Sequence, residues 1–88
     1  MDYLITHGPT IVPVEIKAGK RGSLKSLHIF LYEKQLQHGV RLNMDRPSIG
    51  NFKTIVRMKN VKDKLSYTLI SLPLYLAGQL DRILDDII

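Results

Sequence analysis

The sequence contains no cysteine and no long run of apolar residues. Without cysteine the chain forms neither a disulfide nor a thiolate metal site, which fits a reducing compartment. No segment approaches the roughly 20 consecutive apolar residues that a membrane-spanning helix needs. The first residues also lack the basic segment and apolar run of a secretory signal. We therefore expect a cytoplasmic protein with no membrane partner.

The length of 88 residues suffices for one small domain, residues 1–88. The formal net charge is +5, and the positive charge is concentrated between Lys17 and Lys64. Three aspartates, by contrast, lie close together near the end of the chain, from Asp81 to Asp86. This distribution predicts an anionic partner. The alternative is that the lysines only keep a small domain soluble.

The pattern of apolar residues and turn signals predicts strands and helices in alternation. The predicted elements are strands over residues 2–6 and 11–18, a helix from Leu24 to about Gln37, a strand over 40–44, a hairpin with arms 52–58 and 65–71 that turns through 60–64, and a last helix beginning near Pro73. Ser23 suits the N-cap of the first helix, and Gly39 suits its left-handed end. The order predicts an α/β fold, with a mixed sheet, a parallel crossover and two flanking helices.

Two carboxylates are expected to meet in the first hairpin. Successive side chains of a strand alternate between its faces, so Glu15 and Lys17 point away from the apolar face of their strand. If Thr6 pairs with Ile11, antiparallel register puts Asp2 directly opposite Glu15. Like charges at that distance are destabilising. A divalent cation between the two carboxylates would offset the repulsion.

These residues have the types and spacing of a metal-dependent nuclease core. Asp2 and Glu15, with the backbone carbonyl of Ile16, offer the hard oxygen ligands that Mg²⁺ prefers. Lys17 adds a compact positive charge that can orient a water or neutralise developing charge. A lone Glu-x-Lys on a strand more often reflects alternating charges on a solvated sheet surface. The preceding aspartate and the following helix favour a site instead.

At these positions the sequence resembles a known family. The segments are Asp2-Tyr3-Leu4-Ile5, Val14-Glu15-Ile16-Lys17-Ala18-Gly19 and Ser23-Leu24-Lys25-Ser26-Leu27. Together they resemble the PD-(D/E)xK pattern of the restriction-endonuclease-like superfamily. The whole chain, including the late Ser71-Leu72-Pro73-Leu74-Tyr75-Leu76, is similar to the uncharacterised domain that follows the ATPase core in many prokaryotic AAA-type ATPases.

The resemblance implies a truncated restriction-endonuclease-like core in which Asp2, Glu15 and Lys17 are the motif residues. It implies Mg²⁺ as the cofactor, DNA as a partner, and an ATPase core in the parent chain. Because these residues contain no Walker A sequence, ATP would bind only in that absent core. The family domain has helices and a strand ahead of the motif aspartate. We therefore expect a fragment of a larger protein, inactive by itself or completed by a homo-oligomer.

Further basic and aromatic residues have two interpretations each. Lys20, Arg21 and Lys25 are candidates for phosphate contacts, since basic residues dominate nucleic-acid affinity. The alternative for them is a solvated loop and helix start. We expect His28 to be a packed histidine rather than a ligand. Packing roles are likewise expected for the tyrosines at positions 32, 67 and 75.

Three functions follow from these observations. The first is a nuclease-related domain that acts on or binds DNA with Mg²⁺. The second is a non-catalytic module that keeps the fold to recruit a partner or to pair subunits. The third is a basic DNA-binding module without chemistry, whose affinity would fall steeply with salt. The apolar stripe of the last helix, Leu76 to Ile87, is either an ordinary core face or a binding face.

Overall fold

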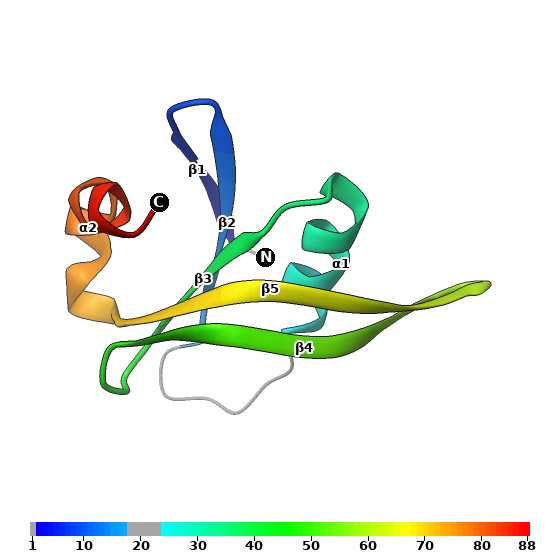
Figure 1. Ribbon diagram of the computed structural model, residues 1–88. Helices are drawn as coiled ribbons and strands as arrows, with labels where there is room; N and C mark the ends of the chain where they lie inside the picture. Colours follow the sequence, from blue (N-terminus) through cyan, green and yellow to red (C-terminus); the bar gives the residue numbers. More distant parts are fainter. Residues whose placement is uncertain (1, 18–23) are drawn as a thin grey trace.

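The computed structural model describes residues 2–17 and 24–88. These residues form a mixed sheet of five strands with helices on both faces (Figure 1). The elements are β1 (Tyr3–His7), β2 (Thr10–Ile16), α1 (Lys25–Lys34), β3 (His38–Asn43), β4 (Ser48–Met58), β5 (Val61–Pro73), the 3₁₀ helix η1 (Leu74–Gln79) and α2 (Leu80–Ile87). The strand order is β1-β2-β3-β5-β4. The predicted α/β fold, a mixed sheet with two flanking helices, is confirmed.

The first hairpin has the predicted register. Thr6 pairs with Ile11, and the antiparallel pairing continues to Tyr3 and Val14. On its other side β2 runs parallel to β3, but that pairing begins only at Val14. Pro13 lies just before it and is buried. Its missing N–H therefore does not interrupt the ladder with β3.

The crossover from β2 through α1 to β3 is parallel, as predicted. Helix α1 is shorter than expected because Gln35 adopts the left-handed conformation (φ 54°) and ends it. The prediction that Gly39 closes the helix is therefore wrong. Ser23, the predicted N-cap, lies outside the described residues. The cap position is held by Leu24, without a side-chain cap bond.

Gly39 lies instead inside β3, where it is buried beneath α1. A Cβ at this position would lie 3.2 Å from Cε2 of Tyr67 and 3.3 Å from Cδ1 of Leu31. Both neighbours belong to the packed core. Glycine is needed here because it lets the helix approach the sheet closely.

We expect Gly39→Ala to lower the free energy of unfolding by about 1–3 kcal/mol, since the added methyl must displace packed side chains. Gly50→Ala is the matched control, because a Cβ at Gly50 has nothing within 4 Å. Urea denaturation of both variants measures the difference. Equal stability of the two variants would contradict the close approach.

The second hairpin is longer than predicted. Met58 pairs with Val61, so the turn is Lys59-Asn60 and not residues 60–64. Residues 61–64 pair with residues 55–58 of β4 and so belong to the ladder. The first arm also begins earlier than the predicted residue 52, because β4 starts at Ser48 opposite Ser71. The hairpin of β4 and β5 extends beyond the rest of the sheet (Figure 1).

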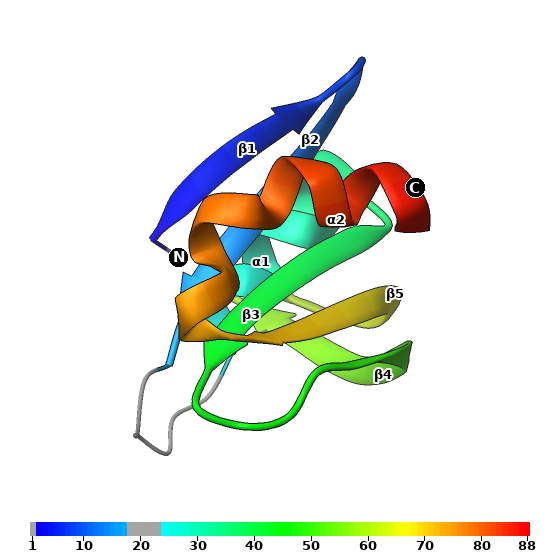
Figure 2. The same cartoon turned by 90° about the vertical axis from the view of Figure 1, so that its left-hand side faces the viewer.

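Two apolar cores lie on opposite faces of the sheet, with α2 in front and α1 behind in Figure 2. Under α2 the buried residues are Val12, Val14, Val40, Leu42, Ile70, Leu72, Leu80 and Leu84. Under α1 they are Leu24, Leu27, Leu31, Val56, Leu65, Tyr67 and Leu69. The predicted stripe of the last helix is therefore a core face. Pro73, expected to begin that helix, is the last residue of β5.

Candidate functional site

The carboxyl groups of Asp2 and Glu15 lie next to each other near the C-terminal end of β2, just before the chain crosses over to α1. The pairing of Tyr3 with Val14 puts Asp2 next to Glu15, as the predicted register requires. Asp2 is held from two sides. Its backbone N–H donates to the carbonyl of Val14 (3.1 Å), and its Oδ2 accepts a bond from the N–H of Ile16 (2.6 Å). The two motif carboxylates are therefore fixed against each other by the backbone of β2.

The pKa values of the two carboxyl groups are shifted in opposite directions. The hydrogen bond from the Ile16 N–H, and a second from Glu15, hold the pKa of Asp2 below its ordinary value. Burial raises the pKa of Glu15, and its hydrogen bond to Asp2 raises it further. Glu15 is only 5% exposed, whereas Asp2 is exposed. Opposite shifts of this kind are typical of two neighbouring acids that share one proton.

Lys17 lies at the same site, directly after β2. Its positive charge lowers the pKa of both carboxyl groups. Its backbone N–H donates to the carbonyl of Leu42 in β3 (2.8 Å), which fixes the chain at this point. The three predicted motif residues are therefore brought together, and Ile16 lies between them in the chain.

The donor set suits a hard divalent cation. Asp2 and Glu15 are oxygen ligands, and a cation between them would take the place of the shared proton. Among residues 2–17 and 24–88, however, no group of three or more His, Cys, Asp or Glu side chains could hold a metal ion. A cation here would need backbone carbonyls, such as that of Ile16, and water to complete its coordination.

A largely buried polar cluster on the strands beside Glu15 was not predicted from the sequence. Arg41 follows Glu15 across the sheet, and Ser71 follows Arg41. The Oγ of Ser71 accepts bonds from Nε (3.2 Å) and Nη2 (3.1 Å) of Arg41 and from Nδ2 of Asn43 (3.0 Å). Ser71 is 1% exposed. Polar residues in the otherwise apolar segments Val40-Arg41-Leu42-Asn43 and Leu69-Ile70-Ser71-Leu72 were the available signal.

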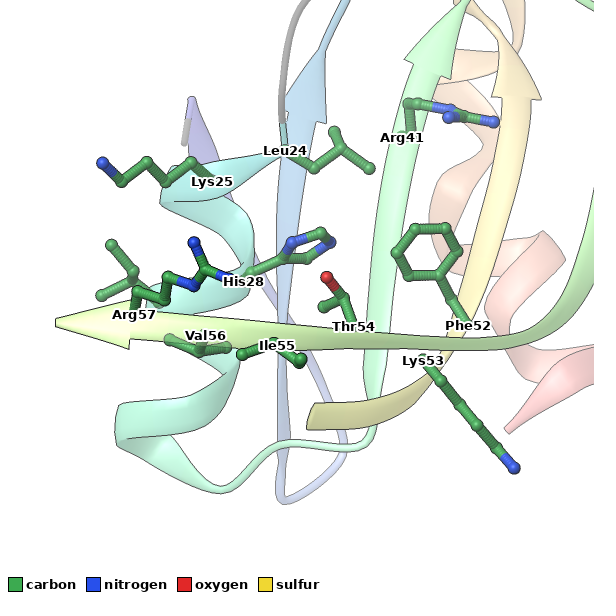
Figure 3. A pocket seen from close by; sticks show the side chains of 11 residues that line it. Leu24, Lys25, His28, Arg41, Phe52, Lys53, Thr54, Ile55, Val56 and Arg57 are labelled. Carbon is green, nitrogen blue, oxygen red and sulfur yellow. The ribbon is translucent and has the colours of Figure 1, made fainter. Parts of the chain in front are cut away.

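An open groove of about 910 Å³ lies between α1 and β4, and Arg41 forms part of its wall. The groove is lined by Leu24, Lys25, His28, Ile29, Arg41, Phe52, Lys53, Thr54, Ile55, Val56 and Arg57. Four of these residues are basic, and none of the described lining residues is acidic. Figure 3 shows His28 and Phe52 projecting into the space, with Arg41 beyond them on β3. Arg41 is also the cross-strand neighbour of Glu15 in the sheet, so one lining residue of the groove adjoins the carboxylate pair, although neither carboxylate lines the groove.

The other predicted residues have mixed outcomes. Lys25 is exposed at the start of α1 and lines the groove, whereas Lys20 and Arg21 lie outside the described residues. His28 is packed as expected, with Nε2 2.9 Å from the hydroxyl of Tyr67. Burial lowers the pKa of His28 and raises the pKa of Tyr67 to about 12.

Two of the three tyrosines have the predicted packing role. Tyr67 is buried in the core under α1, and Tyr32 packs against that core while its hydroxyl donates to Asp63 (2.8 Å). The prediction for Tyr75 is wrong, because its side chain is 82% exposed. Tyr75 lies on the 3₁₀ helix η1, one residue before the apolar stripe begins at Leu76.

The raised pKa of Glu15 predicts how stability depends on pH. Between the ordinary value of 4.5 and the raised value, the folded protein keeps a proton that the unfolded chain releases. The free energy of unfolding should therefore fall as pH rises through that window. The lowered pKa of Asp2 acts oppositely, but below its ordinary value of 3.8.

We expect Glu15→Gln to remove this fall, because the amide keeps a donor toward Asp2 and cannot ionise. The variant should match the unmodified protein in acid and exceed it in stability near neutral pH. Urea denaturation at a series of pH values, without divalent metal, measures the effect. A stability difference that does not vary with pH would refute the shared proton.

Comparisons with protein-family models, with curated proteins and with solved structures find no match to this chain. The resemblance to the PD-(D/E)xK pattern therefore rests on the motif residues themselves. In the part of the chain described here, no helix is both long enough and apolar enough to cross a membrane.

Proposed function

We propose that the protein is a nuclease-related domain of the PD-(D/E)xK type, which acts on or binds DNA with Mg²⁺. The resemblance further suggests that it is the C-terminal domain of a cytoplasmic AAA-type ATPase. The observation that carries the proposal is the juxtaposition of Asp2, Glu15 and Lys17 at one end of β2. The basic groove, whose lining residue Arg41 neighbours Glu15 in the sheet, supports a polyanionic substrate.

Each residue has a role that its surroundings allow. Asp2 and Glu15, with the carbonyl of Ile16, would hold Mg²⁺, which when bound lowers the pKa of a water and offsets charge on a phosphate. The bonds from the Ile16 N–H and to the Val14 carbonyl orient Asp2 before any metal arrives. Lys17 places a positive charge beside both carboxylates, where negative charge develops in phosphodiester hydrolysis.

A second candidate is a non-catalytic module that pairs subunits or recruits a partner. The edge strands favour it, because within residues 2–17 and 24–88 β1 and β4 each pair with a strand on one side only. Such edges are ready templates for pairing with another chain. This candidate predicts that the carboxylate pair binds no divalent metal.

Cleavage of DNA by the full-length parent protein tests the leading proposal. We expect cleavage with Mg²⁺, none with EDTA, and none for Glu15→Ala under either condition. Glu33→Ala is the matched control, since Glu33 is exposed on α1 and should be dispensable. Cleavage that survives Glu15→Ala, or no metal-dependent cleavage at all, would overturn the catalytic assignment.

A further inference from the structure

The groove between α1 and β4 combines positive charge with an accessible aromatic ring. Lys25 stands at the start of α1, Arg41 on β3 and Arg57 on β4, so the cations reach the groove from three elements. Phe52 of β4 also lines the groove and is 36% exposed. A groove that carries charge alone would suit any polyanion, whereas the ring adds a requirement for a flat partner.

The aromatic ring is rigidly supported. The ring centroid of Phe52 lies 5.4 Å from that of His28 and 5.6 Å from that of Tyr67. His28 is in turn bonded to the Tyr67 hydroxyl, and Tyr67 is buried in the core. These contacts hold Phe52 in place from below. In Figure 3 its ring points into the open groove, on the same side of β4 as the Arg41 side chain.

Arg41 is also fixed before any ligand binds. Two of its nitrogens donate to the buried Oγ of Ser71, which sets the plane of the guanidinium. Arginine planes and aromatic rings both stack on unpaired bases. In duplex DNA the faces of the bases are covered by their neighbours in the stack. A ring and a guanidinium that both line a basic groove therefore favour a single strand.

We propose that this groove binds single-stranded nucleic acid, with a base stacked on Phe52 and phosphates held by Lys25, Arg41 and Arg57. This inference rests on the proposed function, which already takes a nucleic acid as the ligand. It goes further by naming an unpaired strand as the substrate class. It also places the binding surface between α1 and β4, with Arg41 joining that surface to the carboxylate pair.

Fluorescence anisotropy with a labelled oligothymidylate, in EDTA, tests the proposal on the whole 88-residue chain. Phe52→Leu should weaken binding roughly 5- to 100-fold, the range typical of losing one base–aromatic stack. Phe52→Tyr should restore it. Far-ultraviolet circular dichroism and a thermal melt confirm that each variant is folded. A blunt duplex of the same length should bind more weakly than the single strand.

Arg57 and Lys62 provide a matched pair for the charge. They are cross-strand partners in the hairpin, but only Arg57 lines the groove. Arg57→Gln should reduce the slope of log affinity against log salt by about 0.7, the value for one phosphate on a single strand. Lys62→Gln should leave that slope unchanged.

Three outcomes would overturn the inference. They are full affinity in Phe52→Leu, equal or tighter binding of the duplex, and equally effective competition by polyglutamate, which would indicate an acidic protein as the partner.

Failure of this inference can be distinguished from failure of the proposed catalysis. If Glu15→Ala abolishes cleavage while Phe52→Leu binds the single strand normally, the function stands and this inference falls. If Phe52 and Arg57 govern binding but no cleavage occurs, the inference stands and the nuclease assignment falls.

Discussion

Ser71→Ala should lower the free energy of unfolding by roughly 2–4 kcal/mol, although it removes a single oxygen atom. That oxygen accepts bonds from Nε and Nη2 of Arg41 and from Nδ2 of Asn43, and Ser71 is 1% exposed. Alanine leaves the amide of Asn43, itself 5% exposed, with a buried donor that has lost its acceptor. A buried donor without a partner costs more than the net value of the bond it made.

Ser66→Ala is the control for this prediction, because Ser66 lies on the same strand, β5, and is exposed. We expect its effect to stay within about 0.5 kcal/mol. Urea denaturation of the two variants gives the comparison. A loss at Ser71 no larger than at Ser66 would show that Arg41 and Asn43 find other partners. In that case the guanidinium would not be held in the orientation that we assign to it.

Leu84→Ala should lower the free energy of unfolding by about 2–5 kcal/mol, as is usual for truncating a fully buried leucine. Leu84 is 0% exposed and belongs to the core that α2 forms with β2, β3 and β5. A domain of this size has a total stability of roughly 5–15 kcal/mol at most. The variant should therefore unfold at much lower urea concentration and lose the docking of α2.

Ile88→Ala is the control for Leu84→Ala, and the two variants together test the alternative that the last helix presents a binding face. Ile88 is 42% exposed, so its truncation should cost roughly 1 kcal/mol or less. If Leu84→Ala proved as mild as Ile88→Ala, the stripe would not be a core face in solution. Strong destabilisation at Leu84 alone agrees with the packing of α2 on the sheet.

The sheet and the crossover were predictable because their signals are local. The alternation from Val12 to Lys17 and the turn around Gly8 fixed both the faces of β2 and its register with β1. Gly8 has a positive φ of 61°, which its position in the turn requires. The end of α1 was not predictable in this way. Gln35 takes the left-handed conformation and ends the helix, whereas Gly39 lies inside β3, where a Cβ would crowd Tyr67.

The candidate site was predictable only where its residues are close along the hairpin. Asp2, Glu15 and Lys17 share one register, so a single assumed pairing, Thr6 with Ile11, brought them together. Arg41 and Ser71 come from strands whose neighbours depend on the order β2-β3-β5. No local pattern specifies that order, and the groove between α1 and β4 depends on it as well. Arg41 and the basic groove could therefore be recognised only from the tertiary structure.

Calorimetric titration of Mg²⁺ and Mn²⁺ into the protein is the most direct test of the central claim, that Asp2 and Glu15 form a metal site. We expect a dissociation constant in the low-millimolar range or below. Because the cation replaces the shared proton, binding should release more protons per cation as the experiment is moved to a pH closer to the raised pKa of Glu15. Glu15→Gln should abolish the binding while the variant stays folded. No measurable heat from the unmodified protein, or undiminished binding by Glu15→Gln, would contradict the account.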